Sequence, residues 1–180
     1  MGSSSGIVVG LTTTALVTVG VLAYQASATV PGTIAAPQAK ASAAPKAPRD
    51  KKHPTALPSG SGKGERVVYS LDDDRVWLVA TGNKVGRTFR VTPSTVDPSP
   101  GTYAVTSRSN TVTGSDGTPV EHVVRFTSVD GVAIGFSAAV DGSTAAPVRT
   151  VRTGGIRESR ADGEAMWDFA TIGARVVVIR

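Results

Sequence analysis

The sequence predicts a mainly β fold, a β-sandwich with one short helix in its C-terminal half. Two observations predict it: short apolar segments separated by turn-forming residues follow Gly64, and only one later stretch has helical spacing. A third observation is a change of composition before that point. The 180 residues, 40% hydrophobic and 18% charged, therefore divide into an N-terminal segment at 1–28, a linker at 29–63 and a folded domain at 64–180.

The first segment predicts an apolar helix. Residues Gly6 to Ala23 are 18 uncharged, mostly apolar residues, close to the lower limit of about 20 needed to span a bilayer. Ala26-Ser27-Ala28 fits the small-x-small pattern of a signal peptidase site. Two interpretations stay open, a cleaved signal peptide and an uncleaved membrane anchor that holds the protein to the membrane through residues 6–28.

The linker carries the excess positive charge. Residues 29–63 contain six Pro and eight Ala and no aromatic residue, which predicts a disordered, extended segment. Residues 40–66 hold seven cations and two anions, whereas 67–180 hold 12 of each. Because the folded part is neutral overall, nucleic acid is not expected as a partner. The linker is expected to act as a spacer or to contact anionic wall polymer or lipid headgroups.

Seven strands are expected in the domain, each bounded by turn signals rich in Gly, Pro, Asp or Asn. They are Glu65–Ser70, Arg75–Ala80, Gly86–Thr92, Thr102–Ser107, Val120–Thr127, Val132–Phe136 and Arg175–Ile179. The continuous apolar run of the last predicts a central strand. In Val120–Thr127, alternation places Val120, His122, Val124 and Phe126 on one face, with His122 half-buried.

One helix is expected after Ser159, which with Asp162 forms a plausible N-terminal cap. Ala165, Met166, Phe169 and Ala170 then share a face at helical spacing, and Gly173 marks the end.

Composition excludes several chemistries. The chain has no cysteine, which removes disulfides, thiolate catalysis, iron–sulfur clusters and cysteine zinc sites. With two histidines, one of them in the linker, a histidine metal cluster is not expected. Asp72-Asp73-Asp74 lacks the spacing of a calcium loop and is interpreted as a solvated turn. No cofactor is predicted.

Several segments nevertheless resemble, in order, the catalytic domain of L,D-transpeptidases, the YkuD-type enzymes that cross-link bacterial cell walls. Ser70–Val91 resembles the opening hairpin and the strand that follows it, and Pro100-Gly101-Thr102-Tyr103 resembles a Thr-Pro-x-Gly-x-Tyr/Phe segment without its Thr. Val132-Ala133-Ile134 resembles the strand that leads to the first family histidine. Arg152–Arg157 stands where the family has Ser/Thr-His-Gly-Cys-hydrophobic-Arg/Asn.

The departures from this motif decide the predicted activity. The resemblance places Thr153 at the histidine position, Gly155 at the catalytic cysteine position, and Gly135 or Phe136 at the first histidine. The family chemistry is acyl transfer through a thiolate, and neither glycine nor threonine replaces the nucleophile and its base. No catalytic residue is therefore predicted.

The candidate ligand-binding residues are Thr153, Gly154, Gly155 and Arg157. Arg157 can bind a carboxylate through its planar fork, or it can be a surface arginine paired with Glu158 or Asp162. Gly154-Gly155 can also be a simple turn with positive φ.

Three functions follow. The first is an exported, catalytically inactive L,D-transpeptidase-like protein of the cell envelope, outside the cytoplasm, that binds peptidoglycan peptide or a protein partner. The second is an enzyme with residual or altered acyl transfer through Thr153 or Ser137. The third is an unrelated all-β extracellular binding module. Eleven Arg against one Lys in 67–180 is typical of a high-GC genome and suggests an actinobacterial source.

Overall fold

The computed structural model of the chain describes residues 52–180. The segment predicted at 1–28 and most of the linker lie outside the described residues. Among residues 52–180, no helix combines the length and apolar character needed to cross a membrane.

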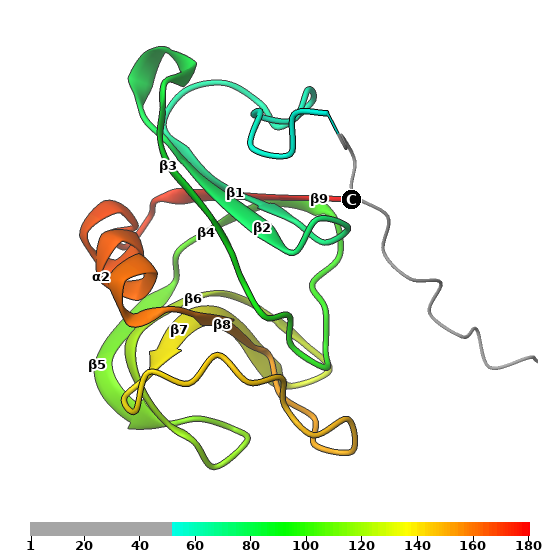
Figure 1. Ribbon diagram of the computed structural model, residues 1–180, viewed down its shortest axis with the longest axis vertical. Coiled ribbons are helices and arrows are strands. Elements are labelled where there is room, and N and C mark those ends of the chain that lie inside the picture. Colours follow the sequence, from blue (N-terminus) through cyan, green and yellow to red (C-terminus); the bar gives the residue numbers. More distant parts are fainter. Residues whose placement is uncertain (1–51) are drawn as a thin grey trace, which may run out of the picture. The chain divides into compact units, whose positions relative to one another are not determined.

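The described chain is mainly β, with strands in two sheets (Figure 1). The first sheet has five strands in the order β3-β2-β1-β9-β4. Their bounds are β1 Arg66–Ser70, β2 Arg75–Val79, β3 Val85–Arg90, β4 Gly101–Ala104 and β9 Arg175–Ile179. β9 pairs parallel with β1 and antiparallel with β4, so the prediction of a central C-terminal strand is confirmed.

The second sheet has four strands in the order β5-β6-β7-β8. Their bounds are β5 Ser107–Thr113, β6 Pro119–Val129, β7 Val132–Ala139 and β8 Gly155–Glu158. β5, β6 and β7 form an antiparallel meander, and β8 joins β7 in parallel after the long connection that follows Ala139.

Apolar side chains from both sheets form one core. Tyr69 meets Phe136 edge to face at 5.8 Å between ring centroids, and Phe126 stacks on Phe136 at 5.2 Å. Met166 of the helix and Ala170, which follows its last residue, are fully buried in the same cluster. Burial of apolar surface between the layers is the main stabilising contribution to such a fold.

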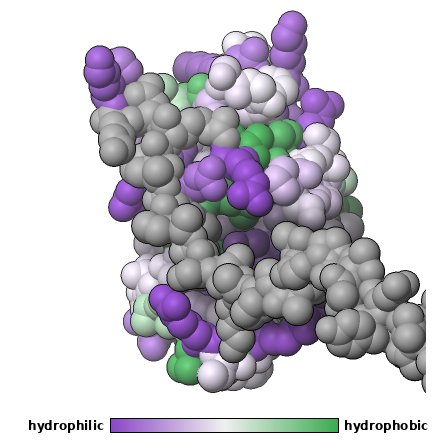
Figure 2. Space-filling view, turned by 90° about the vertical axis from the view of Figure 1, so that its right-hand side faces the viewer, coloured by the Kyte–Doolittle hydropathy of each residue, from purple (hydrophilic) through white to green (hydrophobic). Residues whose placement is uncertain are grey.

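The predicted helix is α2, Arg160–Phe169. Its N-cap is Ser159, whose Oγ accepts a hydrogen bond from the Asp162 backbone N–H at 3.2 Å, so the predicted cap is confirmed. In Figure 1, α2 lies at the side of the two sheets. On the face shown in Figure 2, apolar side chains of the described residues form small patches separated by hydrophilic ones.

The face predicted for β6 is wrong in its first half. The register with β7 shifts between Glu121 and Val124, and His122 has a φ of 53°. Such a bulge turns the residues before it relative to those after it. Val124 and Phe126 therefore face the core, whereas Val120 lines a pocket on the other side. His122 is half-buried, as expected, with its ring 5.8 Å from that of Trp167.

The end of the segment assigned to the linker packs on the outer face of the five-stranded sheet. Trp77 donates a hydrogen bond from Nε1 to the Thr55 carbonyl at 2.9 Å, and Leu57 packs beside Trp77. Ser61 is buried. Ordered contacts of the domain therefore begin before Gly64.

Candidate functional site

A pocket of about 380 Å³ lies on the face of the four-stranded sheet that is turned away from the core. Alternation along β7 builds its floor, since Ile134 and Phe136 enter the core while Gly135 and Ser137 line the pocket. Of the two positions considered for the first family histidine, Gly135 thus lies at the pocket and Phe136 does not.

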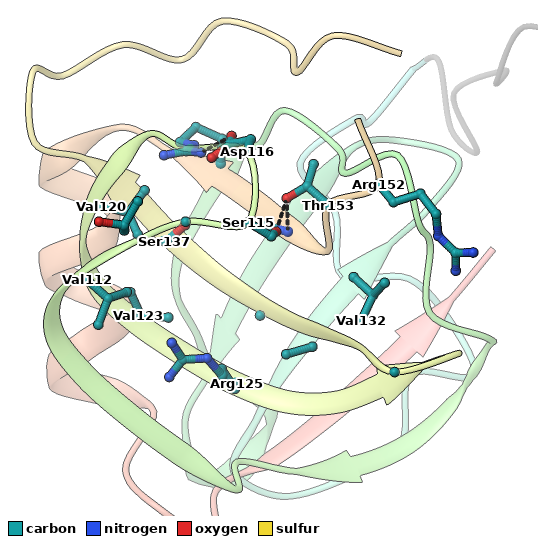
Figure 3. A pocket seen from close by; sticks show the side chains of 17 residues that line it. Val112, Ser115, Asp116, Val120, Val123, Arg125, Val132, Ser137, Arg152 and Thr153 are labelled. Carbon is teal, nitrogen blue, oxygen red and sulfur yellow. Dashed lines mark hydrogen bonds and ion pairs between the residues drawn. The ribbon is translucent and has the colours of Figure 1, made fainter. Parts of the chain in front are cut away.

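The segment 152–157 supplies one wall of this pocket. Arg152, Thr153, Gly155 and Arg157 all line it, whereas Gly154 does not. The structure therefore brings three of the four predicted ligand-binding residues together with Gly135 and Ser137. Figure 3 shows Ser137, Arg152 and Thr153 at the pocket, with Val112, Val120 and Val123 as an apolar side.

The two glycines have different roles. A Cβ on Gly154 would stand 2.2 Å from the Ala133 carbonyl oxygen, so the backbone of β7 leaves no room for a side chain there. A Cβ on Gly155 would meet Thr153 Oγ1 at 3.6 Å and Ser137 Oγ at 3.9 Å, which are ordinary contacts. Gly155 begins β8 and neither glycine is among those with positive φ, so the interpretation of this pair as a turn is wrong.

Thr153 is held by neighbours on three sides. Its Oγ1 lies 2.7 Å from Ser115 Oγ and accepts the Gly155 N–H at 3.3 Å, and its own N–H donates to Thr95 Oγ1 at 3.0 Å. It is 2% exposed. A threonine fixed in this way positions the backbone of residues 153–155 more than it presents a free hydroxyl to solvent.

Arg157 is also buried, and its partner is neither of the two acids considered from the sequence. Its Nη2 donates to Asp116 Oδ2 at 2.9 Å, with 8% and 12% of the two side chains exposed. Its Nη1 is buried and has no hydrogen-bond partner. The predicted pairing with Glu158 or Asp162 is wrong, because Glu158 follows Arg157 in a strand and points to the opposite face, and Asp162 pairs with Arg87 at 2.7 Å.

Glu158 is the second buried ionisable residue of β8. Both of its carboxylate oxygens lack a hydrogen-bond partner, and it lies beneath Gly163 of α2. Burial, with a smaller contribution from the charge of Asp162, raises the pKa of the Glu158 carboxyl well above its ordinary value. Glu158 belongs to the core side of the sheet and does not line the pocket.

The chemistry that the pocket can perform follows from its lining. None of the lining residues is a cysteine, histidine, lysine or glutamate, and the lone acid, Asp116, is paired with Arg157. The hydroxyls of Ser115, Ser137 and Thr153 therefore have no neighbouring base to activate them. Arg125, Arg152 and Arg157 give the lining an excess of positive charge, which favours an anionic ligand.

The sequence did not indicate Ser115, Asp116, Thr95 or Arg125 as parts of this site. Ser115 and Asp116 were interpreted only as members of the turn 114–117, which the structure contains. The contact from Asp116 to Arg157 joins residues 41 positions apart, so no local pattern announces it. In residues 52–180, no group of three or more His, Cys, Asp or Glu side chains is placed to hold a metal ion.

The comparison with solved structures supports the fold. No family model and no curated protein matches the sequence. Among solved structures, an L,D-transpeptidase (Yku) from Stackebrandtia nassauensis matches with a TM-score of 0.53 at 16% identity, over 66% of this chain and 56% of that chain. An L,D-transpeptidase from Xylanimonas cellulosilytica matches with a TM-score of 0.53 at 17% identity, over 70% of this chain and 65% of that one.

The catalytic domain of the Enterococcus faecium L,D-transpeptidase matches over its full length, 100% of that chain and 67% of this one, with a TM-score of 0.50 at 17% identity. The described residues therefore form an L,D-transpeptidase-like domain, although the chain spans less than two thirds of the length of the first two relatives. The resemblance inferred from the sequence is confirmed at the level of the fold. Since the chain has no cysteine, it does not perform catalysis that depends on a cysteine thiolate.

Proposed function

We propose that the protein is an exported, catalytically inactive member of the L,D-transpeptidase-like group in the bacterial cell envelope, and that it binds peptidoglycan peptide. The observation that carries this proposal is the pocket at Gly155. It is open and lined by three arginines, and it holds neither a thiol nor a base.

Binding fits this pocket better than turnover. Peptides of the wall carry carboxylates, and a guanidinium binds a carboxylate through parallel N–H donors. Arg157 is buried, where such a charge-assisted hydrogen bond is less screened than at the surface. The valines on the other side, Val112, Val120 and Val123, offer apolar contact to the aliphatic parts of a peptide.

A co-sedimentation experiment with purified peptidoglycan tests the proposal. The full chain is expected to sediment with the polymer, and the Arg157→Gln variant is expected to stay in the supernatant. Arg149→Gln is the matched control, because it removes the same charge from an exposed residue that does not line the pocket. Equal binding by both variants and the wild type would show that retention does not depend on Arg157, and would overturn the role of the pocket.

Residual acyl transfer through Ser137 or Thr153 is the competing function. Incubation of the full chain with a wall tetrapeptide donor, followed by intact-protein mass spectrometry, is expected to show no covalent adduct. An adduct on either hydroxyl would overturn the assignment as inactive.

A further inference from the structure

The ion pair between Asp116 and Arg157 leaves some of the N–H donors of the arginine without a partner. Asp116 contacts Nη2 through Oδ2, while the buried Nη1 has no partner. A carboxylate that faces a guanidinium squarely accepts from two of its N–H groups at once. The pair seen here is therefore an incomplete version of that arrangement, with one donor left over.

Asp116 is unable to bind Arg157 through both of its carboxylate oxygens without giving up another contact. Its second oxygen, Oδ1, accepts the backbone N–H of Thr118 at 3.0 Å and so stabilises the turn between β5 and β6. One carboxylate is thus shared between a turn and an arginine. A ligand carboxylate makes no hydrogen bond to this turn, so both of its oxygens are available to Arg157.

The pair also stands at a boundary between two cavities. Asp116 and Arg157 line the pocket of about 380 Å³ and also a second one of about 190 Å³. The second is lined by Ala139 at the end of β7 and by small residues that follow it, among them Ala146, Pro147 and Val148, and also by the polar residues Thr118 and Ser143. Figure 3 shows Asp116 at the edge of the first pocket, joined by dashed lines to its partner. A group bound in place of Asp116 would have a second small cavity of mixed polarity beside it.

We infer that Arg157 is a receptor for the free α-carboxylate at the end of a wall peptide, and that Asp116 is an internal occupant which this carboxylate must displace. The inference rests on the proposed function and adds the group that is bound and the residue that limits its binding. The adjoining cavity of about 190 Å³ has room for a small side chain, such as the methyl of alanine, beside Ala139 and Ala146.

Titration of the full chain with acetyl-alanyl-alanine, followed by NMR, tests the inference. Asp116→Asn keeps an oxygen for the Thr118 N–H and removes the charge that competes for Arg157. It is expected to tighten binding by roughly tenfold or more, the equivalent of one charge-assisted hydrogen bond. The same peptide with a C-terminal amide is expected to show no such gain.

Two variants serve as controls. Asp130→Asn removes the same charge from an exposed acid that lies 3.7 Å from Arg152, another pocket arginine, and is expected to change affinity by less than about twofold. Arg157→Lys keeps the positive charge but loses the planar fork, and is expected to abolish the gain produced by Asp116→Asn. Thermal unfolding of each variant confirms that it is folded.

The outcomes separate this inference from the proposed function. If Asp116→Asn binds the peptide no more tightly than the wild type while the wild type still sediments with peptidoglycan, Asp116 is not a competitor and the inference is wrong. If neither protein binds peptide or peptidoglycan, both proposals fail. The D,D and L,L forms of the peptide distinguish the source, since a preference for L,L would overturn the assignment to wall peptide and leave the competition intact.

Discussion

Single residues decide what this pocket can hold. Gly154 and Gly155 are neighbours of the same type, yet only the first is required by packing. Gly154 passes directly beneath the carbonyl of Ala133, whereas Gly155 opens toward the pocket. The absence of a side chain at Gly155 is therefore not imposed by space at the Cβ position, and we expect the pocket to accept a small side chain there.

A pair of substitutions tests this difference. Gly155→Cys is expected to change the free energy of unfolding by less than about 1 kcal/mol, whereas Gly154→Ala is expected to cost about 3 kcal/mol because backbone must move. Urea unfolding measures both values, and a thiol reagent reports whether the new cysteine faces the pocket. Equal stability of the two variants would contradict the close approach of Gly154 to β7.

Glu158 is expected to make stability depend on pH. Its folded-state pKa is raised above the ordinary value of 4.5, so the folded protein favours the protonated form. The resulting stability is fully present below that ordinary value and decreases as pH rises toward the folded-state pKa. Glu158→Gln removes this dependence, and is expected to raise the unfolding midpoint at neutral pH by about 4–8 °C.

Thermal unfolding at a series of pH values measures the effect. The difference between wild type and Glu158→Gln should shrink as the solution is acidified. Glu164→Gln, on the exposed side of α2, is the control and should change the midpoint little at any pH. A constant difference across the whole range would contradict titration of Glu158 as the cause.

At the scale of elements, the segment before β1 is attached to the sheet by a buried arginine. Arg66 is 1% exposed and donates to the carbonyls of Ser61 and Gly64 at 2.6 and 2.5 Å and to Asn83 Oδ1 at 2.9 Å. One side chain thus connects the incoming chain, the start of β1 and the turn after β2. This explains why a Pro- and Ala-rich stretch has ordered contacts at its end.

Replacement of this arginine should loosen the segment. Arg66→Met is expected to cost about 2–3 kcal/mol, because several buried acceptors lose their donors at once. In a Trp167→Phe background, the emission of Trp77 is expected to shift to longer wavelength, since Trp77 lies beneath the segment and bonds to Thr55. Unchanged stability and emission would show that the contacts of Arg66 do not hold the segment in place.

At the scale of the whole molecule, the C-terminal strand closes the domain. β9 lies between β1 and β4, and its two faces are buried in different clusters, Val176 and Val178 in the core between the sheets and Val177 on the outer side. Both neighbours of β9 therefore depend on it for hydrogen bonds and for apolar contact.

Removal of residues 175–180 is expected to leave the chain unfolded, whereas removal of Arg180 alone should be tolerated because it lies outside β9. Far-UV circular dichroism and the dispersion of amide NMR signals measure the outcome. A cooperative unfolding transition in the longer deletion would contradict a central role for β9.

Much of the fold was predictable from local patterns. The apolar runs at β1, β2 and β9 and the cap at Ser159 use rules that operate within a few residues, and the structure confirms them. β5 and β8 were not predicted as strands. β5 is largely polar and lies at a sheet edge, and β8 is short, begins with glycine and lies at the other edge of the same sheet. The prediction of which β6 residues share a face is wrong at His122, because a bulge breaks the alternation on which such a prediction depends.

The sequence by itself determined that no thiolate chemistry is available and that the domain is built mainly of strands, and its resemblance to a known family grouped Thr153, Gly155 and Arg157 as one expected motif. Composition and local periodicity are properties of the chain and survive without any tertiary contact. The tertiary structure alone decided that Gly154 is sterically required, that Glu158 is buried without a partner, and that Arg157 meets Asp116. These are outcomes of packing between separate elements, whose contacts no local pattern in the sequence specifies.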